Sequence, residues 1–151
     1  MIIPSAAHND IIFKALADGA KIELTTHGTS MFPYIWPNST ITVEKRSAYN
    51  IDEVIVFDAP AKGSFIAHRL VKYDSTHFTT IGDSCLTLDA QGKTEKILGV
   101  VTHIRGSWFS YNPNGQLGRL YGKMIRKTSP LSHIFCNICA KAVHVLNRIL
   151  K

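Results

Sequence analysis

The stretch SFIAHRLVKY, residues 64–73, decides the fold class of this protein. It is rich in apolar and aromatic residues, holds neither glycine nor proline, and ends at the turn signal Asp74-Ser75. A run of this kind, bounded by turn residues, is typical of a β-strand. The sequence therefore predicts one long strand near the middle of the chain.

Shorter runs of the same kind lie on both sides of it. They are Lys21–His27, Thr40–Glu44, Glu53–Phe57, Thr76–Ile81 and Lys96–Arg105. Turn signals separate them, at Asn38-Ser39, at residues 61–63 and at Gln91-Gly92. Several short strands at such spacing predict a mainly β protein, a compact barrel or sandwich.

A short helix is expected before the first strand, over residues 10–18. The residues placed on one helical face are Ile11, Ile12, Ala15 and Leu16. Asp10 is the expected N-cap and Gly19 the expected stop. Residues 28–38 hold two prolines and fit neither the helical nor the strand period, so they predict a loop or a short helical turn.

Length and composition exclude several classes of protein. With 151 residues, 45% hydrophobic and 19% charged, the chain suits one globular domain and neither a disordered nor a fibrous protein. Its three cysteines form no disulfide framework. No stretch reaches about 18 consecutive apolar residues, and residues 1–10 carry no basic n-region or apolar h-region. We therefore expect a cytoplasmic protein with neither a transmembrane helix nor a signal peptide.

The charge divides the chain into two parts. Residues 1–111 hold ten Lys+Arg and eleven Asp+Glu, a net charge of −1, whereas residues 112–151 hold seven Lys+Arg and no acid, a net charge of +7. This asymmetry predicts a body over 1–111 and a basic tail over 112–151 with an anionic partner, either a membrane surface or nucleic acid. A solvated basic face is the alternative reading.

The tail has the pattern of basic amphipathic helices. Leu117–Lys127 is helix-compatible and basic, and a second helix is expected after Ser129-Pro130. The apolar stripe of that second helix is Leu131, Ile134, Phe135, Ile138, Ala142, Val145, Leu146 and Ile149. Such a helix docks on the body, on a partner or in a membrane interface, which would place the protein peripherally at a membrane. No basic surface interleaved with aromatic residues is readable, so nucleic acid is the less favoured partner.

The segment Gly28–Pro33, GTSMFP, carries the chemistry that the sequence suggests most strongly. Ser30 lies between a glycine two residues before it and a proline three residues after it. A constrained turn of this kind can expose a hydroxyl and leave backbone N–H groups available, which are the needs of acyl transfer. The alternative is an ordinary turn serine.

Two later segments supply the other groups of such chemistry. His68 lies inside the long predicted strand, and residues 81–89 bring two carboxylates, Asp83 and Asp89, into one loop. Serine, histidine and aspartate spread through a β domain can form a relay of nucleophile, general base and orienting carboxylate. The alternative is a strand histidine that is satisfied by other contacts.

In order and wording these segments resemble the S26 signal peptidase family, within the clan that includes the LexA-type self-cleaving proteins. Gly28–Pro33 is similar to its Gly-x-Ser-Met-x-Pro box. The other matching segments are 39–43, 52–57, 65–71, 82–89 and 97–101. The resemblance covers about residues 22–105 and implies an S24/S26 peptidase-like barrel or sandwich over 1–111.

The resemblance also implies roles for individual residues. Ser30 would be the nucleophile, and His68 the general base in place of lysine, followed by Arg69 as in the endoplasmic-reticulum type of the family. Asp89 would orient the imidazole, and Asp83 would hold the loop or assist. Histidine acts as a base near neutral pH without the burial that lysine requires, but it needs a partner that fixes its tautomer.

The turn around the serine would form the oxyanion hole. The N–H of Ser30 would contribute to it, held by its neighbours Gly28, Thr29 and Met31. Position 28 is glycine, so the hydroxyl that some bacterial members contribute there is absent.

We therefore expect a serine endopeptidase that cleaves a peptide or leader sequence after small residues, with no cofactor. The alternatives are a self-cleaving or dimerising regulatory member of the clan, and a non-enzymatic binding module that uses the basic tail. Cys85, close to Asp83, is a weaker nucleophile candidate because no nearby residues prepare it better than Ser30 is prepared. The residues His133, Cys136, Cys139 and His144 suggest a metal site, but a lone CxxC is a weak zinc signal, and no metal is expected.

Overall fold

A computed structural model describes residues 6–59, 64–127 and 138–139 of the chain. These residues form a mainly β protein with one eight-stranded sheet and few helices. The strands are β1 (Ile22–Thr25), β2 (Thr40–Glu44), β3 (Val54–Ala59), β4 (Ser64–Tyr73), β5 (His77–Ile81), β6 (Gly92–Lys93), β7 (Ile97–Arg105) and β8 (Ser110–Tyr111). The helices are α1 (Ala6–Ala17), the 3-10 turn η2 (Thr94–Lys96) and α2 (Gln116–Lys127).

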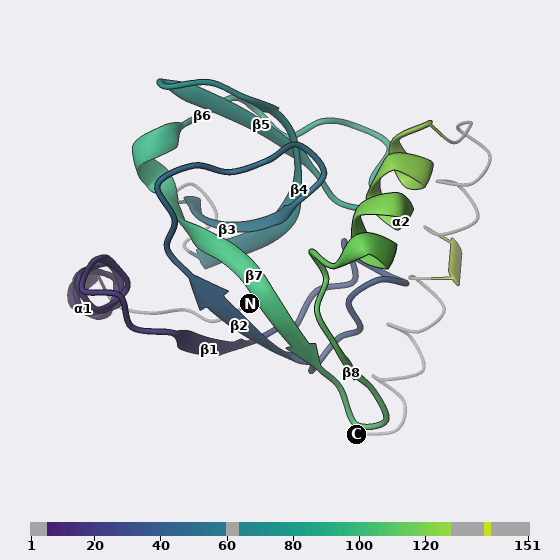
Figure 1. Ribbon diagram of the computed structural model, residues 1–151, viewed down its shortest axis with the longest axis horizontal. Coiled ribbons are helices and arrows are strands. Elements are labelled where there is room, and N and C mark those ends of the chain that lie inside the picture. Colours follow the sequence, from purple (N-terminus) through teal and green to yellow (C-terminus); the bar gives the residue numbers. More distant parts are fainter. Residues whose placement is uncertain (1–5, 60–63, 128–137, 140–151) are drawn as a thin grey trace.

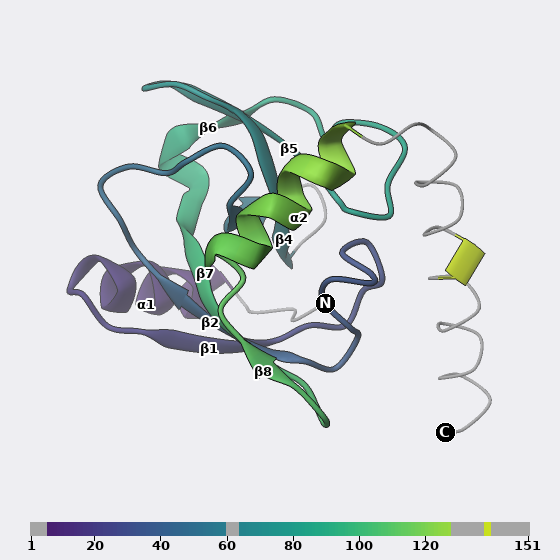
Figure 2. The same ribbon diagram turned by 45° about the vertical axis from the view of Figure 1, so that its right-hand side comes forward.

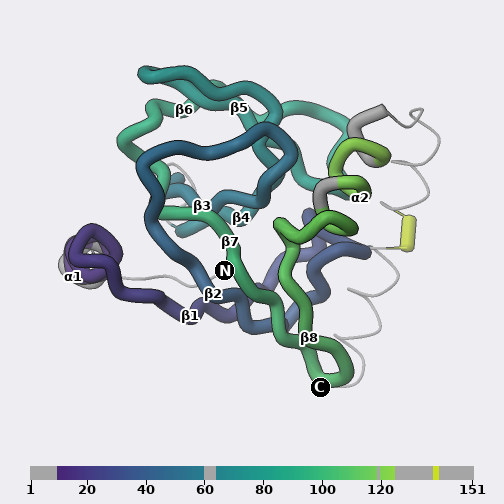
Figure 3. The backbone as a smooth tube through the Cα atoms, in the orientation of Figure 1, coloured from purple at the N-terminus to yellow at the C-terminus, as the bar shows by residue number. Residues whose placement is uncertain are grey.

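All strand pairs of the sheet are antiparallel, in the order β1-β2-β7-β3-β4-β5-β6, with β8 pairing β7. The sheet curls into a half-barrel, which Figure 1 shows as a ribbon and Figure 3 as a tube. Register shifts occur at Thr42/Val43 in β2, Val56/Phe57 in β3 and Leu70/Lys72 in β4. Such shifts bend a strand and increase its twist, which suits the curled shape.

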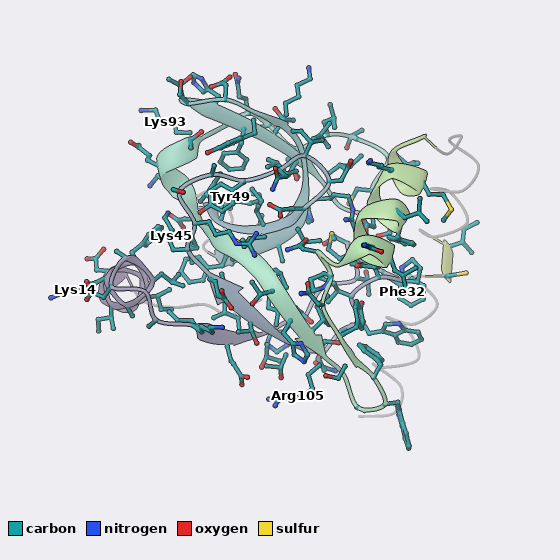
Figure 4. All side chains as sticks on the ribbon, in the orientation of Figure 1. Lys14, Phe32, Lys45, Tyr49, Lys93 and Arg105 are labelled. Atoms are coloured by element: carbon teal, nitrogen blue, oxygen red, sulfur yellow. The ribbon has the colours of Figure 1, made fainter. Side chains whose placement is uncertain are left out.

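Two apolar cores lie on the two faces of the curled sheet. Residues of β3 alternate between them, because Val54 and Val56 belong to one cluster and Ile55 and Phe57 to the other. The first cluster includes α1 and the turn after β1; the second includes Tyr49, which Figure 4 shows within the curl. Burial on both faces explains why β3 is a continuous apolar run rather than an alternating one.

Helix α1 confirms the predicted N-terminal helix and corrects its details. It begins at Ala6, so Asp10 lies within the helix and the predicted N-cap is wrong. Ile11 is 67% exposed, whereas Ile12 and Leu16 are buried in the core and Phe13 packs against it. Gly19 ends the helix as predicted, with φ of 85° and its N–H bonded to the carbonyl of Leu16.

The predicted strands are confirmed, and Thr40–Glu44 and Ser64–Tyr73 agree at both ends. The prediction left open a barrel or a sandwich, and the described strands form a single curled sheet. Strands β6 and β8 were not predicted because each spans two residues, too few for a periodic signal. Residues 30–34 form the turn expected between Gly28 and Asn38.

Helix α2 confirms the helix predicted over Leu117–Lys127, and it packs against the sheet at β4 (Figure 2). A Cβ added to Gly118 would lie 1.7 Å from the carbonyl oxygen of Pro113, and one added to Gly122 would lie 2.8 Å from Nη1 of Arg69. Both positions require glycine for this close approach.

The second tail helix, predicted over residues 131–149, lies outside the described residues except for 138 and 139. The same holds for His133, Cys136 and His144. No helix in the described part of the chain has the length and apolar character needed to cross a membrane.

Candidate active site

Three side chains from separate elements meet in one hydrogen-bonded chain. Nε2 of His68, in β4, lies 2.9 Å from Oγ of Ser30, and Nδ1 of the same ring lies 2.5 Å from Oδ2 of Asp89. With Asp89 ionised, Oδ2 can only accept, so Nδ1 carries the ring proton and Nε2 of the neutral imidazole accepts the Ser30 hydroxyl proton. The arrangement can take a proton from the serine as its oxygen attacks a carbonyl.

The turn that carries Ser30 is tied to the loop after β5. Within the turn, the N–H of Phe32 donates to the carbonyl of Thr29 at 3.0 Å. Ser84 then bonds it twice, through its N–H to the Ser30 carbonyl at 2.9 Å and through its hydroxyl to the Thr29 carbonyl at 2.8 Å. These bonds use the carbonyls and leave the serine hydroxyl directed at His68.

The predicted oxyanion residues lie around this turn. Met31 is buried and lines the same cleft as Gly28 and Ser30. Nothing lies within 4 Å of a Cβ added to Gly28, so that side of the turn is open. Within the described residues, the N–H of Ser30 donates to no backbone carbonyl, which leaves it available for a developing oxyanion.

Thr80 completes the site, and sequence reasoning missed it. This residue of β5 is fully buried, and its hydroxyl donates to Oδ2 of Asp89 at 2.7 Å. Its carbonyl accepts the N–H of Asp89 at 2.8 Å. The sequence around a strand threonine does not indicate which carboxylate its hydroxyl will bind, so sequence analysis could not identify Thr80.

Gly82 allows the three segments to approach one another. A Cβ at this position would lie 2.6 Å from the Ser30 carbonyl oxygen, 2.7 Å from Sγ of Cys85 and 3.1 Å from Nε2 of His68. No side chain fits there without moving the turn or the imidazole. The glycine of the predicted Gly-Asp box is thus explained by packing against the serine turn.

Asp83, the second predicted carboxylate, binds Arg69 and not His68. Its carboxylate accepts from Nε at 2.8 Å and from Nη2 at 2.7 Å, and both side chains are almost completely buried. Nη1 donates to the Asp52 carbonyl at 2.7 Å. Burial lowers the pKa of Arg69, but the hydrogen bonds and charge of Asp83 outweigh it and raise the pKa above its ordinary value. Asp83 therefore holds the loop, one of the two roles expected of it.

Two aromatic rings and α2 enclose this ion pair. The guanidinium carbon of Arg69 lies 4.9 Å from the ring centroid of Tyr34 and 5.6 Å from that of Tyr121 in α2. The two rings stack with centroids 4.6 Å apart. Burial raises the pKa of Tyr34 to about 12, with Arg69 acting against the rise and Asp83 adding to it. Tyr34 is therefore neutral at ordinary pH.

The site opens into a cleft of about 440 Å³ between edge strand β1 and the first half of β4. Its lining includes the three hydrogen-bonded side chains together with Leu24, Thr25, Met31, Ile35, Phe65, Ala67, Cys85 and Thr87. Cys85 thus lies in the cleft, but the imidazole of His68 is directed at Ser30. The apolar lining suits a substrate with apolar side chains.

A second serine–histidine contact, elsewhere in the protein, lacks the other features of the candidate site. Oγ of Ser110 lies 2.7 Å from Nε2 of His103, but both residues are exposed on the β7–β8 hairpin, outside the cleft. Of these two contacts, that of Ser30 alone combines a histidine, a carboxylate on its other nitrogen and a cleft. Within the described residues no cluster of three or more His, Cys, Asp or Glu is suited to a metal ion.

Comparison with known proteins gives no independent assignment. No protein-family model matches the sequence, and no curated protein matches it.

Proposed function

We propose that this protein is a serine endopeptidase that resembles the S26 signal peptidases, with a fold of the S24/S26 peptidase type. The observation that carries the proposal is the chain of hydrogen bonds from Ser30 through His68 to Asp89. Each group has the partner that acyl transfer requires, and the chain faces a cleft.

In the first half of the reaction, Oγ of Ser30 attacks the carbonyl carbon of the scissile peptide bond. Nε2 of His68 takes the hydroxyl proton, and the carboxylate of Asp89 stabilises the resulting imidazolium. The N–H of Ser30 contributes to binding the oxyanion of the tetrahedral intermediate. His68 then gives its proton to the leaving amine, the C–N bond breaks, and an acyl-enzyme forms.

In the second half, water replaces the amine. His68 takes a proton from the water as its oxygen attacks the ester carbonyl, and then returns a proton to Oγ of Ser30 as the ester bond breaks. The products are a new carboxyl terminus and the regenerated hydroxyl. The same imidazole serves both halves, so its orientation by Asp89 matters twice.

The proposed substrate is an extended peptide. β1 ends the strand order of the described sheet and borders the cleft, so its outer edge can pair with a peptide main chain. Alternate side chains of such a peptide would point into the apolar cleft. The resemblance adds a preference for small residues just before the cut.

A peptide-library screen read by mass spectrometry tests the proposal. Purified full-length protein is incubated with peptides rich in small-x-small sequences, beside Ser30→Ala and His68→Ala. Ser110→Ala and His103→Ala are matched controls, because they remove the same groups from the exposed pair. We expect cleavage that both site variants abolish and both control variants retain. Cleavage that persists in Ser30→Ala would refute the proposal.

A further inference from the structure

Helix α2 presents large apolar side chains to solvent. Leu117 is 83% exposed, Leu120 64% and Met124 53%. Their spacing of three and four residues places them on one face of the helix, which we call the outer face. Apolar side chains gathered on an outward surface mark an interaction site more often than isolated ones do.

The packing of α2 fixes this face outward. The opposite face carries Gly118 and Gly122, whose Cα atoms approach the Pro113 carbonyl and the Arg69 guanidinium too closely for any side chain. Tyr121 stacks on Tyr34 and adds to the same anchorage. Rotating the helix to bury the outer face would bring side chains into those contacts.

The charged residues of α2 have one sign. Lys123 is exposed, and α2 as a whole has four basic residues and no acidic one, in a segment, 112–151, with a net charge of +7. Apolar side chains beside cations on one surface helix are typical of binding in the interface of an anionic membrane.

We propose that the outer face of α2 binds a lipid bilayer that contains anionic phospholipid. The cations attract the headgroups, and Leu117, Leu120 and Met124 enter the boundary between headgroups and acyl chains. Nucleic acid is less favoured, because a phosphate backbone offers no burial for three exposed apolar side chains. The surface is separate from the catalytic groups, so lipid binding does not depend on the proposed peptidase activity.

The position of α2 relates the two properties. Its inner face contacts Arg69, which directly follows His68 in β4. Adjacent residues of a strand point to opposite faces of the sheet, so α2 lies on the face of β4 opposite to the one that carries His68. If the proposed activity holds, the enzyme would meet peptides at a membrane surface.

Vesicle co-sedimentation tests the lipid contact with the full-length protein. Vesicles of equal parts phosphatidylglycerol and phosphatidylcholine are compared with vesicles of phosphatidylcholine alone. We expect binding to the anionic vesicles, weakened about tenfold or more in the Leu120→Ser/Met124→Ser double variant by the lost apolar burial. Ile11→Ser removes an equally exposed apolar side chain from α1 and is expected to bind like the unchanged protein.

Three outcomes would overturn the proposal. One is no binding to either vesicle, and another is equal binding to both. The third is anionic binding that falls steeply with salt and is unchanged in the double variant, which would indicate charge attraction alone and leave nucleic acid as the better partner. Peptide cleavage by a protein that binds no vesicles would keep the proposed function and reject only the lipid contact.

Discussion

The hydroxyl of Thr80 donates to Oδ2 of Asp89 at 2.7 Å, on the same oxygen that lies 2.5 Å from Nδ1 of His68. Thr80 is fully buried in β5 and touches Asp89 through its backbone as well. Thr80 therefore fixes the position of the Asp89 carboxylate, and that carboxylate in turn orients the imidazole of His68. Thr80 is a positioning residue, since it acts on the histidine through Asp89.

Thr80→Val keeps the shape of the side chain and removes the hydroxyl. We expect kcat to fall about tenfold with little change in KM, because a hydrogen bond to a charged group is lost in the transition state. Thr80→Ser should restore most of the activity. The proton resonance of His68 Nδ1–H should also move downfield in Thr80→Val, because Oδ2 then has one donor fewer. An unmoved resonance together with an unchanged kcat would reject the positioning role, whatever the substrate.

Asp83→Asn breaks the buried ion pair with Arg69. An uncompensated buried guanidinium costs about 3–5 kcal/mol in the free energy of unfolding. Glu23→Gln is the matched control, because it removes a carboxylate from an exposed pair with Arg105 at 3.2 Å. Such a pair contributes only about 0–1 kcal/mol. Chemical denaturation of both variants measures the difference, and equal losses would contradict the structural role of Asp83.

Gly82→Ala tests the close approach of the serine turn. The new methyl group would lie 2.6 Å from the Ser30 carbonyl oxygen and 3.1 Å from Nε2 of His68. A displacement of about 1 Å costs on the order of 100-fold in rate, so kcat/KM should fall by that factor. Gly28→Ala should retain activity within a few fold, because a Cβ there meets nothing within 4 Å. Steady-state kinetics on the two variants decide between them, and equal losses would contradict the steric argument.

Ionisation of Tyr34 should make the free energy of unfolding depend on pH in the alkaline range. Its pKa is raised from 10.0 to about 12 in the folded protein, mainly by burial. The folded state thus favours the neutral phenol, so this contribution is complete below pH 10.0 and is lost as the pH rises toward about 12. The free energy of unfolding should decrease across that window. Tyr34→Phe should make this decrease shallower. Denaturant titrations of both proteins at several alkaline pH values measure the free energy of unfolding, and the same slope against pH in both would contradict the prediction.

Many of the secondary-structure elements could be predicted from local sequence signals. Strands Thr40–Glu44 and Ser64–Tyr73 and the stop at Gly19 follow from periodicity and from residues within a few positions of each element. Asp10 was misread as the N-cap because the helix begins earlier, at Ala6, and Ile11 was misread as a core residue although it lies on the exposed side of the helix. The sequence alone could also nominate Ser30, His68 and two aspartates, since their residue types and order suit acyl transfer.

Only the tertiary structure decided which of these groups meet. His68 lies 38 positions from Ser30 and 21 from Asp89, and local periodicity carries no information over such separations. The choice depends on strand register, because a slip of one residue would turn His68 to the other face of the sheet. The pairing of β4 with β5 places Thr80 behind Asp89 and leaves Asp83 to Arg69. The sequence thus determined the elements and the candidate groups, whereas register and packing determined their partners.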